Sequence, residues 1–149
     1  MSDAEIHWAR DAEDIKDAIA VRERVFIEEQ GVPAEEELDG RDEEALYLLA
    51  RDPGTGAAIG TLRLLLDGEV AKVGRVAVDR DRRRRGIAAR MLDLALAEAR
   101  TRGATRARLA SQLDAVALYE RAGFAVQSGV FEDAGIPHVW MCMRLATVA

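Results

Sequence analysis

The stretch that decides the fold is Val76-Ala77-Val78-Asp79-Arg80-Asp81-Arg82-Arg83-Arg84-Arg85-Gly86-Ile87-Ala88-Ala89-Arg90. Its apolar start is typical of the end of a strand, its charged centre of a turn, and its last residues of the beginning of a helix. The first amides of a helix have no internal acceptors and point along the helix dipole, so this junction is expected to bind an anion. Gly86 and Ala88 carry minimal side chains, which lets an anion approach the backbone.

The arginines of this stretch add positive charge and can bond phosphate in a bidentate way. A diphosphate is therefore the expected ligand. A solvated helix cap and a nucleic-acid contact are the alternatives for a basic run in this position. A nucleotide-hydrolysing P-loop is not expected, because the lysine and hydroxyl residue of that motif are missing.

Upstream of the junction, hydrophobic periodicity predicts a strand, a long helix and a three-stranded meander. The expected ranges are 5–10 for the strand, 11–31 for the helix, and 45–51, 57–66 and 69–78 for the meander, with a polar loop over 32–44. Asp11 is the expected N-cap of the helix. Gly31 is its expected C-terminal stop.

Downstream, the pattern predicts two helices and three strands. The ranges are 86–102 and 114–123 for the helices, and 106–110, 125–131 and 139–145 for the strands, with a turn over 132–138. Asp114 is the expected cap of the second of these helices, and Gly123 ends it. The order β-α-β-β-β-α-β-α-β-β indicates a mixed α/β fold (an α+β mixed sheet), and residues 1–149 are expected to form one domain.

Composition narrows the classes of protein further. The 149 residues are 49% hydrophobic, which suits one domain with its own core. The chain has a single cysteine, Cys142, so no internal disulfide framework is expected. Its two histidines, His7 and His138, lie far apart in the sequence, so a metal site is not expected either. No apolar run approaches the roughly 20 residues of a membrane span, and the acidic start lacks a signal-peptide core. A cytoplasmic protein that binds neither membrane nor nucleic acid is expected, the latter because the net charge is −6.

Charge is unevenly distributed along the chain. Residues 80–85 are mainly basic, whereas residues 35–44 are mainly acidic. Two such patches predict sites for two oppositely charged ligands, although both could be solvated loops. If the acidic loop borders a substrate, electrostatic attraction favours a cationic or polyamine-like molecule.

The sequence resembles a known family at the junction. Arg83-Arg84-Arg85-Gly86-Ile87-Ala88 is similar to the Gln/Arg-x-x-Gly-x-Gly/Ala signature of the GNAT superfamily, the acetyl-CoA-dependent N-acetyltransferases. Leu118-Tyr119-Glu120-Arg121-Ala122-Gly123-Phe124 resembles the tyrosine-bearing helix of that family, and Gln112 stands where many members have Asn. The order of elements is also similar. Arg84 departs from the signature, because Gly is common at its position.

A narrower resemblance, to the ElaA-like branch, involves three further segments. They are Val25-Phe26-Ile27-Glu28-Glu29-Gln30-Gly31-Val32-Pro33, Glu37-Leu38-Asp39-Gly40-Arg41-Asp42 and Phe131-Glu132-Asp133-Ala134-Gly135-Ile136-Pro137-His138.

The resemblance implies a GNAT fold with a splayed central strand pair and direct transfer of acetyl from the cosubstrate acetyl-CoA to a primary amine. The cosubstrate is expected between the strands 69–78 and 106–110. Backbone groups of Val76 and Val78 would hold its pantetheine arm, and the amides of residues 83–89 its pyrophosphate. The expected binding residues are Val76, Ala77, Val78, Arg83, Arg84, Arg85, Gly86, Ile87, Ala88, Ala89, Gln112 and Tyr119.

The resemblance also assigns catalytic roles. Tyr119 is the expected general acid, which protonates the departing thiolate, although a buried structural tyrosine would look the same. A general base is needed because a free alkylamine, with a pKa near 10.4, is mostly protonated at neutral pH. His138 and Glu29 are the main candidates, with Asp39 and Glu132 also open.

Several properties are left open by the sequence. Cys142 is expected to be an inert thiol rather than a nucleophile. The acceptor is expected to be small, and a homodimer is plausible for such folds. The alternative function is a non-catalytic acyl-CoA- or nucleotide-binding module of the same fold.

Overall fold

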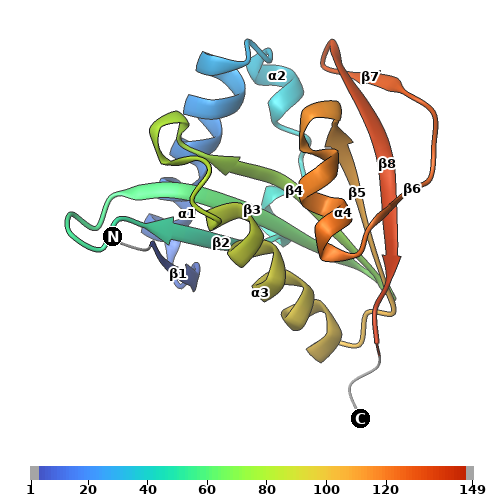
Figure 1. The fold of residues 1–149 in the computed structure, drawn as a ribbon. Coiled ribbons are helices and arrows are strands. Elements are labelled where there is room, and N and C mark those ends of the chain that lie inside the picture. Colours follow the sequence, from blue (N-terminus) through green and yellow to red (C-terminus); the bar gives the residue numbers. More distant parts are fainter. Residues whose placement is uncertain (1–3, 147–149) are drawn as a thin grey trace. The chain divides into compact units, whose positions relative to one another are not determined.

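The computed structural model describes residues 4–146. These residues form two compact units, residues 4–63 with 75–91 and residues 64–74 with 92–146. Three long elements contribute to both units: β3 (Ala58–Asp67), β4 (Val70–Val78) and α3 (Ile87–Thr101). The fold is mixed α/β, as the sequence predicts, and the predicted order of the major elements is confirmed (Figure 1).

In the first unit the strands follow the order β1-β2-β3-β4. β1 (Glu5–Trp8) pairs antiparallel with β2 (Leu46–Arg51). The helix α1 (Ala12–Arg22) begins at the predicted cap, where the Asp11 side chain accepts a hydrogen bond from the amide of Asp14 at 2.9 Å. Ala18 and Val21 of this helix are fully buried in the core.

The predicted long helix changes its winding after α1. Residues Glu23–Glu29 form a π-helix, and the chain then leaves the helix at Gly31 with a φ of +74°. The amide of Gln30 donates to the carbonyl of Val25, five residues back, at 3.1 Å. The apolar spacing does not show the extra residue per turn, because hydrophobic periodicity detects a helix but not a local change in its hydrogen-bond pattern.

The predicted polar loop over 32–44 is more ordered than expected. It contains the helical turn α2 (Ala34–Glu37) and a 3₁₀ turn over Asp42–Glu44. A fully buried arginine, Arg22, binds both: its Nε is 2.6 Å from Glu37 Oε2, and its Nη1 is 2.6 Å from Asp42 Oδ1. Burial alone would lower the pKa of Arg22, but the hydrogen bonds and charges of Glu37 and Asp42 outweigh it and raise the pKa. The buried guanidinium therefore stays charged.

Two further arginines neutralise the same loop. Arg63 on β3 binds both oxygens of Asp39 at 2.7 and 2.8 Å. Arg75 on β4 donates to the carbonyl of Glu37 at 2.7 Å, and its backbone is left-handed, with a φ of +49°. The charges of Glu37, Asp39 and Asp42 are therefore compensated from within the unit, so these three residues do not support the prediction that the acidic stretch attracts a cationic ligand.

In the second unit, β4 and β5 (Arg106–Gln112) pair in parallel over Val70–Lys72 and Arg106–Arg108. β8 (Ile136–Arg144) runs antiparallel to β5 along its whole length. β6 (Ala125–Val126) and β7 (Phe131–Asp133) both pair with β8. The predicted turn over 132–138 is wrong: Ala134 and Gly135, both with positive φ, make a two-residue hairpin between β7 and β8.

The helices of this part of the chain end as predicted but do not all begin as predicted. After α3, Gly103 has a φ of +88°. The helix α4 (Val116–Ala122) ends at Gly123, but Asp114 does not cap it. Asp114 lies within a 3₁₀ turn over Leu113–Ala115, and Ala115 is the N-cap without any side-chain hydrogen bond. The 3₁₀ turn moves the start of the helix beyond the reach of the predicted cap.

Replacing Arg22 with alanine is expected to lower the free energy of unfolding by about 3–5 kcal/mol, since it removes the buried, bidentate partner of the Glu37 carboxylate and leaves only Arg75, whose Nε is 3.3 Å from Glu37 Oε2, as its counter-charge. Urea denaturation at pH 7 measures this. Arg41→Ala is the matched control, because Arg41 pairs with the exposed Glu44, and its effect should stay below about 1 kcal/mol. Equal losses in the two variants would contradict the role of Arg22.

Acid should weaken the fold through Asp39. The hydrogen bonds from Arg63, partly offset by burial, hold the pKa of this carboxyl well below its usual range. Because the folded pKa is below the unfolded value near 3.9, the contribution is full above about pH 4 and is lost as the pH falls further. Urea midpoints between pH 7 and pH 2 should fall less steeply in Asp39→Asn than in the wild type. A matching loss of slope in Asp81→Asn, whose side chain is 82% exposed, would contradict this assignment.

Candidate active site

The turn between β4 and α3 has the backbone of an anion site. The amide of Asp79 donates to the carbonyl of Ile59 at 2.8 Å where β4 ends, and a 3₁₀ turn over Arg80–Arg82 follows. Arg84 and Gly86 are then both left-handed, with φ of +64° and +76°. Turns that enter the left-handed region gather backbone N–H groups into a concave cradle for anions. The helix that comes next, α3, has no acidic residue in its first turn.

The left-handed φ of Arg84 explains why glycine is common at this position of the family signature. A residue with a Cβ loses roughly 1–2 kcal/mol there, whereas glycine does not. Glycine is favoured at position 86 for the same conformational reason. A steric reason does not apply, because a Cβ at this residue would meet nothing within 4 Å. The requirement at both positions is conformational.

Two arginines of the basic run are neutralised by carboxylates. The Arg83 guanidinium binds both oxygens of Glu29 at 2.7 Å, and its Nε donates to the carbonyl of Val78 at 2.9 Å. The Arg82 guanidinium binds Asp52 at 2.6 Å. Arg83 is therefore placed to offer a phosphate its backbone amide rather than its charge, while Arg84 and Arg85 are exposed.

The pair with Arg83 changes what Glu29 can do. The hydrogen bond from Arg83 is the largest influence on this carboxyl and lowers its pKa. A carboxylate with a lowered pKa is a weaker proton acceptor. The structure thus brings together two residues for which the sequence predicted separate roles, and it disfavours Glu29 as the base.

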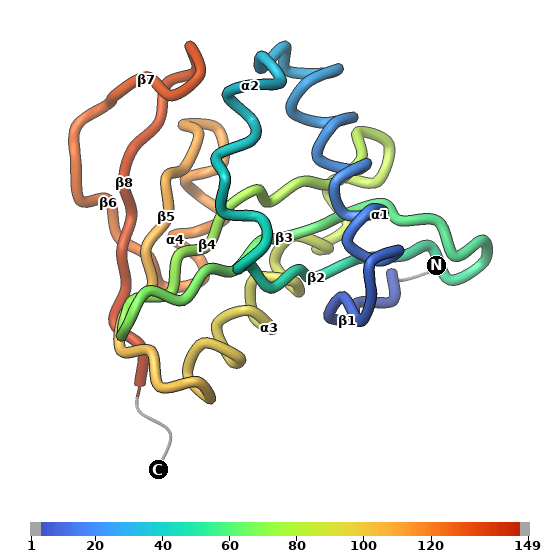
Figure 2. The backbone as a smooth tube through the Cα atoms, turned by 180° about the vertical axis from the view of Figure 1, so that it is seen from behind, coloured from blue at the N-terminus to red at the C-terminus, as the bar shows by residue number. Residues whose placement is uncertain are grey.

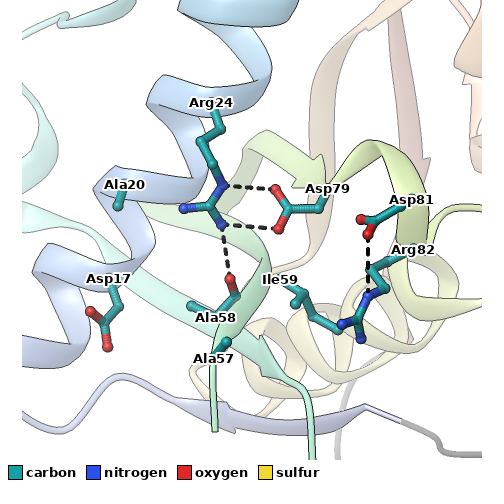
Figure 3. A pocket seen from close by; sticks show the side chains of 9 residues that line it. All are labelled: Asp17, Ala20, Arg24, Ala57, Ala58, Ile59, Asp79, Asp81 and Arg82. Carbon is teal, nitrogen blue, oxygen red and sulfur yellow. Dashed lines mark hydrogen bonds and ion pairs between the residues drawn. The ribbon is translucent and has the colours of Figure 1, made fainter. Parts of the chain in front are cut away.

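A hollow of about 340 Å³ lies beside the turn, within the first unit (Figure 3). In this hollow the guanidinium of Arg24, which lies on the π-helix, donates hydrogen bonds to both carboxylate oxygens of Asp79 at 3.0 Å and to the carbonyl of Ala58 at 2.9 Å. The hollow is lined by Asp17, Ala20, Arg24, Ala57, Ala58, Ile59, Asp79, Asp81 and Arg82. None of these is a predicted binding residue, and their evident effect is to fix the first residue of the turn.

The alternation of backbone amides along β4 gives the directions of the Val76 and Val78 amides. Successive residues of a strand direct their amides to opposite edges. Since the amide of Asp79 points to β3, those of Val78 and Val76 point away from it. Ala77 is buried, so its side chain belongs to the core of the unit.

Tyr119 is held on α4 in the second unit. Its side chain is buried and meets Phe124 edge-to-face, with 6.1 Å between ring centroids. The amide of Phe124 donates to the Tyr119 carbonyl at 3.0 Å, which closes the helix after Gly123. Burial raises the pKa of the Tyr119 phenol to about 12. The phenol therefore keeps its proton at neutral pH, as a general acid must.

His138 lies near the start of β8, directly opposite Gln112 at the end of β5. Its side chain is buried, and its Nδ1 is 2.7 Å from the carbonyl oxygen of Ile136. Because a carbonyl only accepts hydrogen bonds, Nδ1 carries the proton, and Nε2 of the neutral ring holds the lone pair. This tautomer suits a general base that acts through Nε2.

Tyr119 and His138 lie on opposite faces of the β5–β8 ladder. Gly123, at the end of α4, lies against Met143, since a Cβ there would stand 3.2 Å from Met143 Cε. Figures 1 and 2 agree that α4 covers one face of these strands. Met143 and His138 differ by an odd number of residues along β8, so their side chains point to opposite faces.

One group of residues was not predicted from the sequence. Arg108, Trp140, Phe131 and His138 form a continuous stack on the face away from α4. Alternation along β5 and β8 could have placed three of them on one face, but the β7 hairpin that adds Phe131 was not predicted. The other base candidates lie elsewhere: Asp39 is bound to Arg63, and Glu132 is exposed on β7.

The described part of the chain contains neither a cluster of metal-ligating side chains nor a candidate membrane-spanning helix. Within residues 4–146, no group of three or more His, Cys, Asp or Glu side chains could hold a metal ion. None of the helices in that range has the length and apolar character that crossing a membrane requires.

The comparison with known families identifies the class of protein. The acetyltransferase (GNAT) domain family matches residues 11–145, so the chain belongs to the GNAT acetyltransferase family. The uncharacterized N-acetyltransferase YjcF of Bacillus subtilis is 37% identical over 134 residues, which cover 89% of this chain and 94% of that protein.

Solved structures have the same fold. An acyl-CoA N-acyltransferase from Pseudomonas aeruginosa superposes with a TM-score of 0.81 and 26% identity, covering 93% of this chain and 98% of that one. ElaA of Escherichia coli superposes with a TM-score of 0.82 and 21% identity, covering 93% and 98%. The resemblance to the GNAT superfamily, with ElaA among its structural neighbours, is therefore confirmed.

Replacing Gly86 with aspartate should weaken the binding of coenzyme A at least tenfold, because the variant strains the left-handed φ and places a negative charge in the cradle. Isothermal titration calorimetry measures this. Gly86→Ala is the control that adds the strain without the charge, and it should lose less affinity. Wild-type affinity in the aspartate variant would mean that the diphosphate binds elsewhere.

Proposed function

We propose that this protein transfers acetyl from acetyl-CoA directly to a primary amine of a small acceptor. The observation that carries the proposal is the cradle formed by left-handed Arg84 and Gly86 before the first turn of α3, which contains no acidic residue. A solved GNAT acetyltransferase from Elizabethkingia anophelis has acetyl-CoA bound; it superposes with a TM-score of 0.75 and 16% identity over 97% of this chain and 100% of that one. A cytoplasmic location fits this substrate.

The residues present fit the cosubstrate in a defined way. Amides of residues 83–89 bind the pyrophosphate, with charge from Arg84 and Arg85 at the rim. Backbone groups of Val76 and Val78 bind the amides of the pantetheine arm as an added strand would. The Val78 amide polarises the thioester carbonyl, as in an oxyanion hole. When bound, acetyl-CoA supplies the thioester that the amine attacks.

Two different residues accept and donate the protons of the reaction. His138 accepts a proton from the ammonium form of the acceptor at Nε2, either directly or through one water. Tyr119 donates its phenolic proton to the thiolate that leaves. The high pKa of Tyr119, caused by burial, lets it recover that proton at neutral pH.

The alternative is a module of the same fold that binds acyl-CoA or a nucleotide without turnover. Release of free coenzyme A is the decisive measurement, followed with a thiol reagent across amino acids, polyamines, aminosugars and peptides. Amine-dependent release supports the proposal. Micromolar coenzyme A binding with no release for any amine supports the alternative, and RNA binding that falls steeply with salt would indicate a nucleic-acid module.

Removing the phenolic oxygen in Tyr119→Phe should lower kcat on the order of 100-fold, because the leaving thiolate loses its proton donor. Affinity for coenzyme A, measured by calorimetry, should stay within about twofold, since phenylalanine preserves the edge-to-face contact with Phe124. Wild-type kcat in this variant would remove Tyr119 from the acid role.

A further inference from the structure

The two faces of the β5–β8 ladder differ in how far their side chains are buried. On the face toward α4, the side chains of Ala107, Leu109, Ser111, Val139 and Met141 are buried. On the opposite face, the side chains are half-buried or exposed apart from His138. We call this opposite face the arginine–aromatic face and define it by Arg106, Arg108, Phe131, His138, Trp140 and Arg144.

Three arginines crowd one end of the arginine–aromatic face. Arg106 and Arg144 are direct partners in the antiparallel register, and Arg108 is two residues further along the same face. Like charges directly opposite each other destabilise a sheet. Within residues 4–146, no carboxylate forms an ion pair with any of the three. In a chain with a net charge of −6, this is a concentrated positive region that an anion would complement.

The aromatic stack holds one of these arginines in place. The guanidinium carbon of Arg108 is 4.0 Å from the centroid of the Trp140 ring. Trp140 stacks on Phe131 with 5.3 Å between centroids, and Phe131 stacks on His138 with 6.0 Å. Because Phe131 stacks against two rings and Trp140 is contacted by Phe131 and by the Arg108 guanidinium, the stack offers few free faces to nucleobases. It therefore pre-organises a cation and does not form a base-stacking platform.

The stack also links the arginines to the proposed base. Arg108 is opposite Cys142, four residues along β8 from His138, and Arg144 is six residues from it. At about 3.4 Å per residue, these separations correspond to roughly 14 and 20 Å. One elongated molecule can therefore contact His138 and the arginines together.

We propose that the arginine–aromatic face binds the amine acceptor and selects one that carries an anionic group, carboxylate or phosphate, roughly 14–20 Å from its amino group. This inference rests on the proposed function. The amino group lies at His138, the connecting chain runs along Phe131 and Trp140, and the anion is bound by Arg108, Arg106 and Arg144. The charges of Glu37, Asp39 and Asp42 are compensated by Arg22, Arg63 and Arg75, so these three residues give no argument for a cationic acceptor.

The first test compares acceptors that differ only in charge. The probes are the peptide amides Ala-Ala-Ala-Ala-X, with X as glutamate, glutamine, lysine or phosphoserine, and the readout is kcat/KM for coenzyme A release. We expect the glutamate peptide to exceed the glutamine peptide about tenfold and the lysine peptide to be poorest. Preference for phosphoserine over glutamate identifies phosphate as the anion. Equal rates for glutamate and glutamine overturn the inference but leave the proposed function intact, whereas no release with any amine means the function itself has failed.

The second test uses matched variants. Arg108→Gln should reduce the glutamate-to-glutamine ratio of kcat/KM toward one, chiefly by raising KM for the glutamate peptide. Arg121→Gln removes the same charge from an exposed position on α4 and should keep the wild-type ratio. Arg144→Gln, also exposed, serves as the second test variant if Arg108→Gln does not fold. An unchanged ratio in every folded arginine variant of the face overturns the inference.

A third measurement does not depend on turnover. Cys142 is the only cysteine of the chain and is half-exposed opposite Arg108. Without acetyl-CoA, the glutamate peptide should slow the alkylation of Cys142 by iodoacetamide at concentrations where the glutamine peptide does not. Equal alkylation rates with and without saturating glutamate peptide overturn the inference. So does a wild-type dimer that Arg144→Glu converts to a monomer, because the face would then be covered by a second copy of the chain.

Discussion

The buried charge of Arg22 is the constraint on which the first unit depends. A fully buried guanidinium is tolerated only when carboxylates and hydrogen bonds replace its water, and here Glu37 and Asp42 provide them. Both residues lie within the chain segment between α1 and β2, so the requirement of one side chain fixes the course of a polar segment. Arg63 and Arg75 extend the same cluster to β3 and β4, which ties the segment to the strand that leads into the anion cradle.

The cradle itself depends on backbone conformation more than on charge. Of the arginines in the basic run, Arg82 and Arg83 are occupied by Asp52 and Glu29, and they stiffen the turn. Arg24 holds Asp79 at its start. The left-handed residues Arg84 and Gly86 then direct the amides. Ion pairs thus shape the turn, and in the proposed function its peptide groups contact the ligand.

The sequence predicted the major elements because their signals are local: the cap of Asp11, the stop at Gly123 and the apolar periods of α1 and α3. It failed where the deciding interaction is distant. The order of residues 32–44 depends on Arg22, and the β7–β8 hairpin on pairing across Ala134 and Gly135. The signature located the candidate cradle. Neither the Glu29–Arg83 pair nor the stack from Arg108 to His138 could be predicted from the sequence, because each joins residues that only folding brings together.

The placement of Tyr119 and His138 on opposite faces of one two-stranded ladder has a kinetic consequence in the proposed mechanism. In the tetrahedral intermediate the amine nitrogen and the leaving sulfur are bonded to one carbon, so in this mechanism His138 and Tyr119 act on that centre from opposite sides of the hydrogen-bonded backbone of β5 and β8. Neither group can neutralise the other between turnovers. Each must exchange with bulk solvent by its own route, so buffer accessibility on either side could limit the cycle independently.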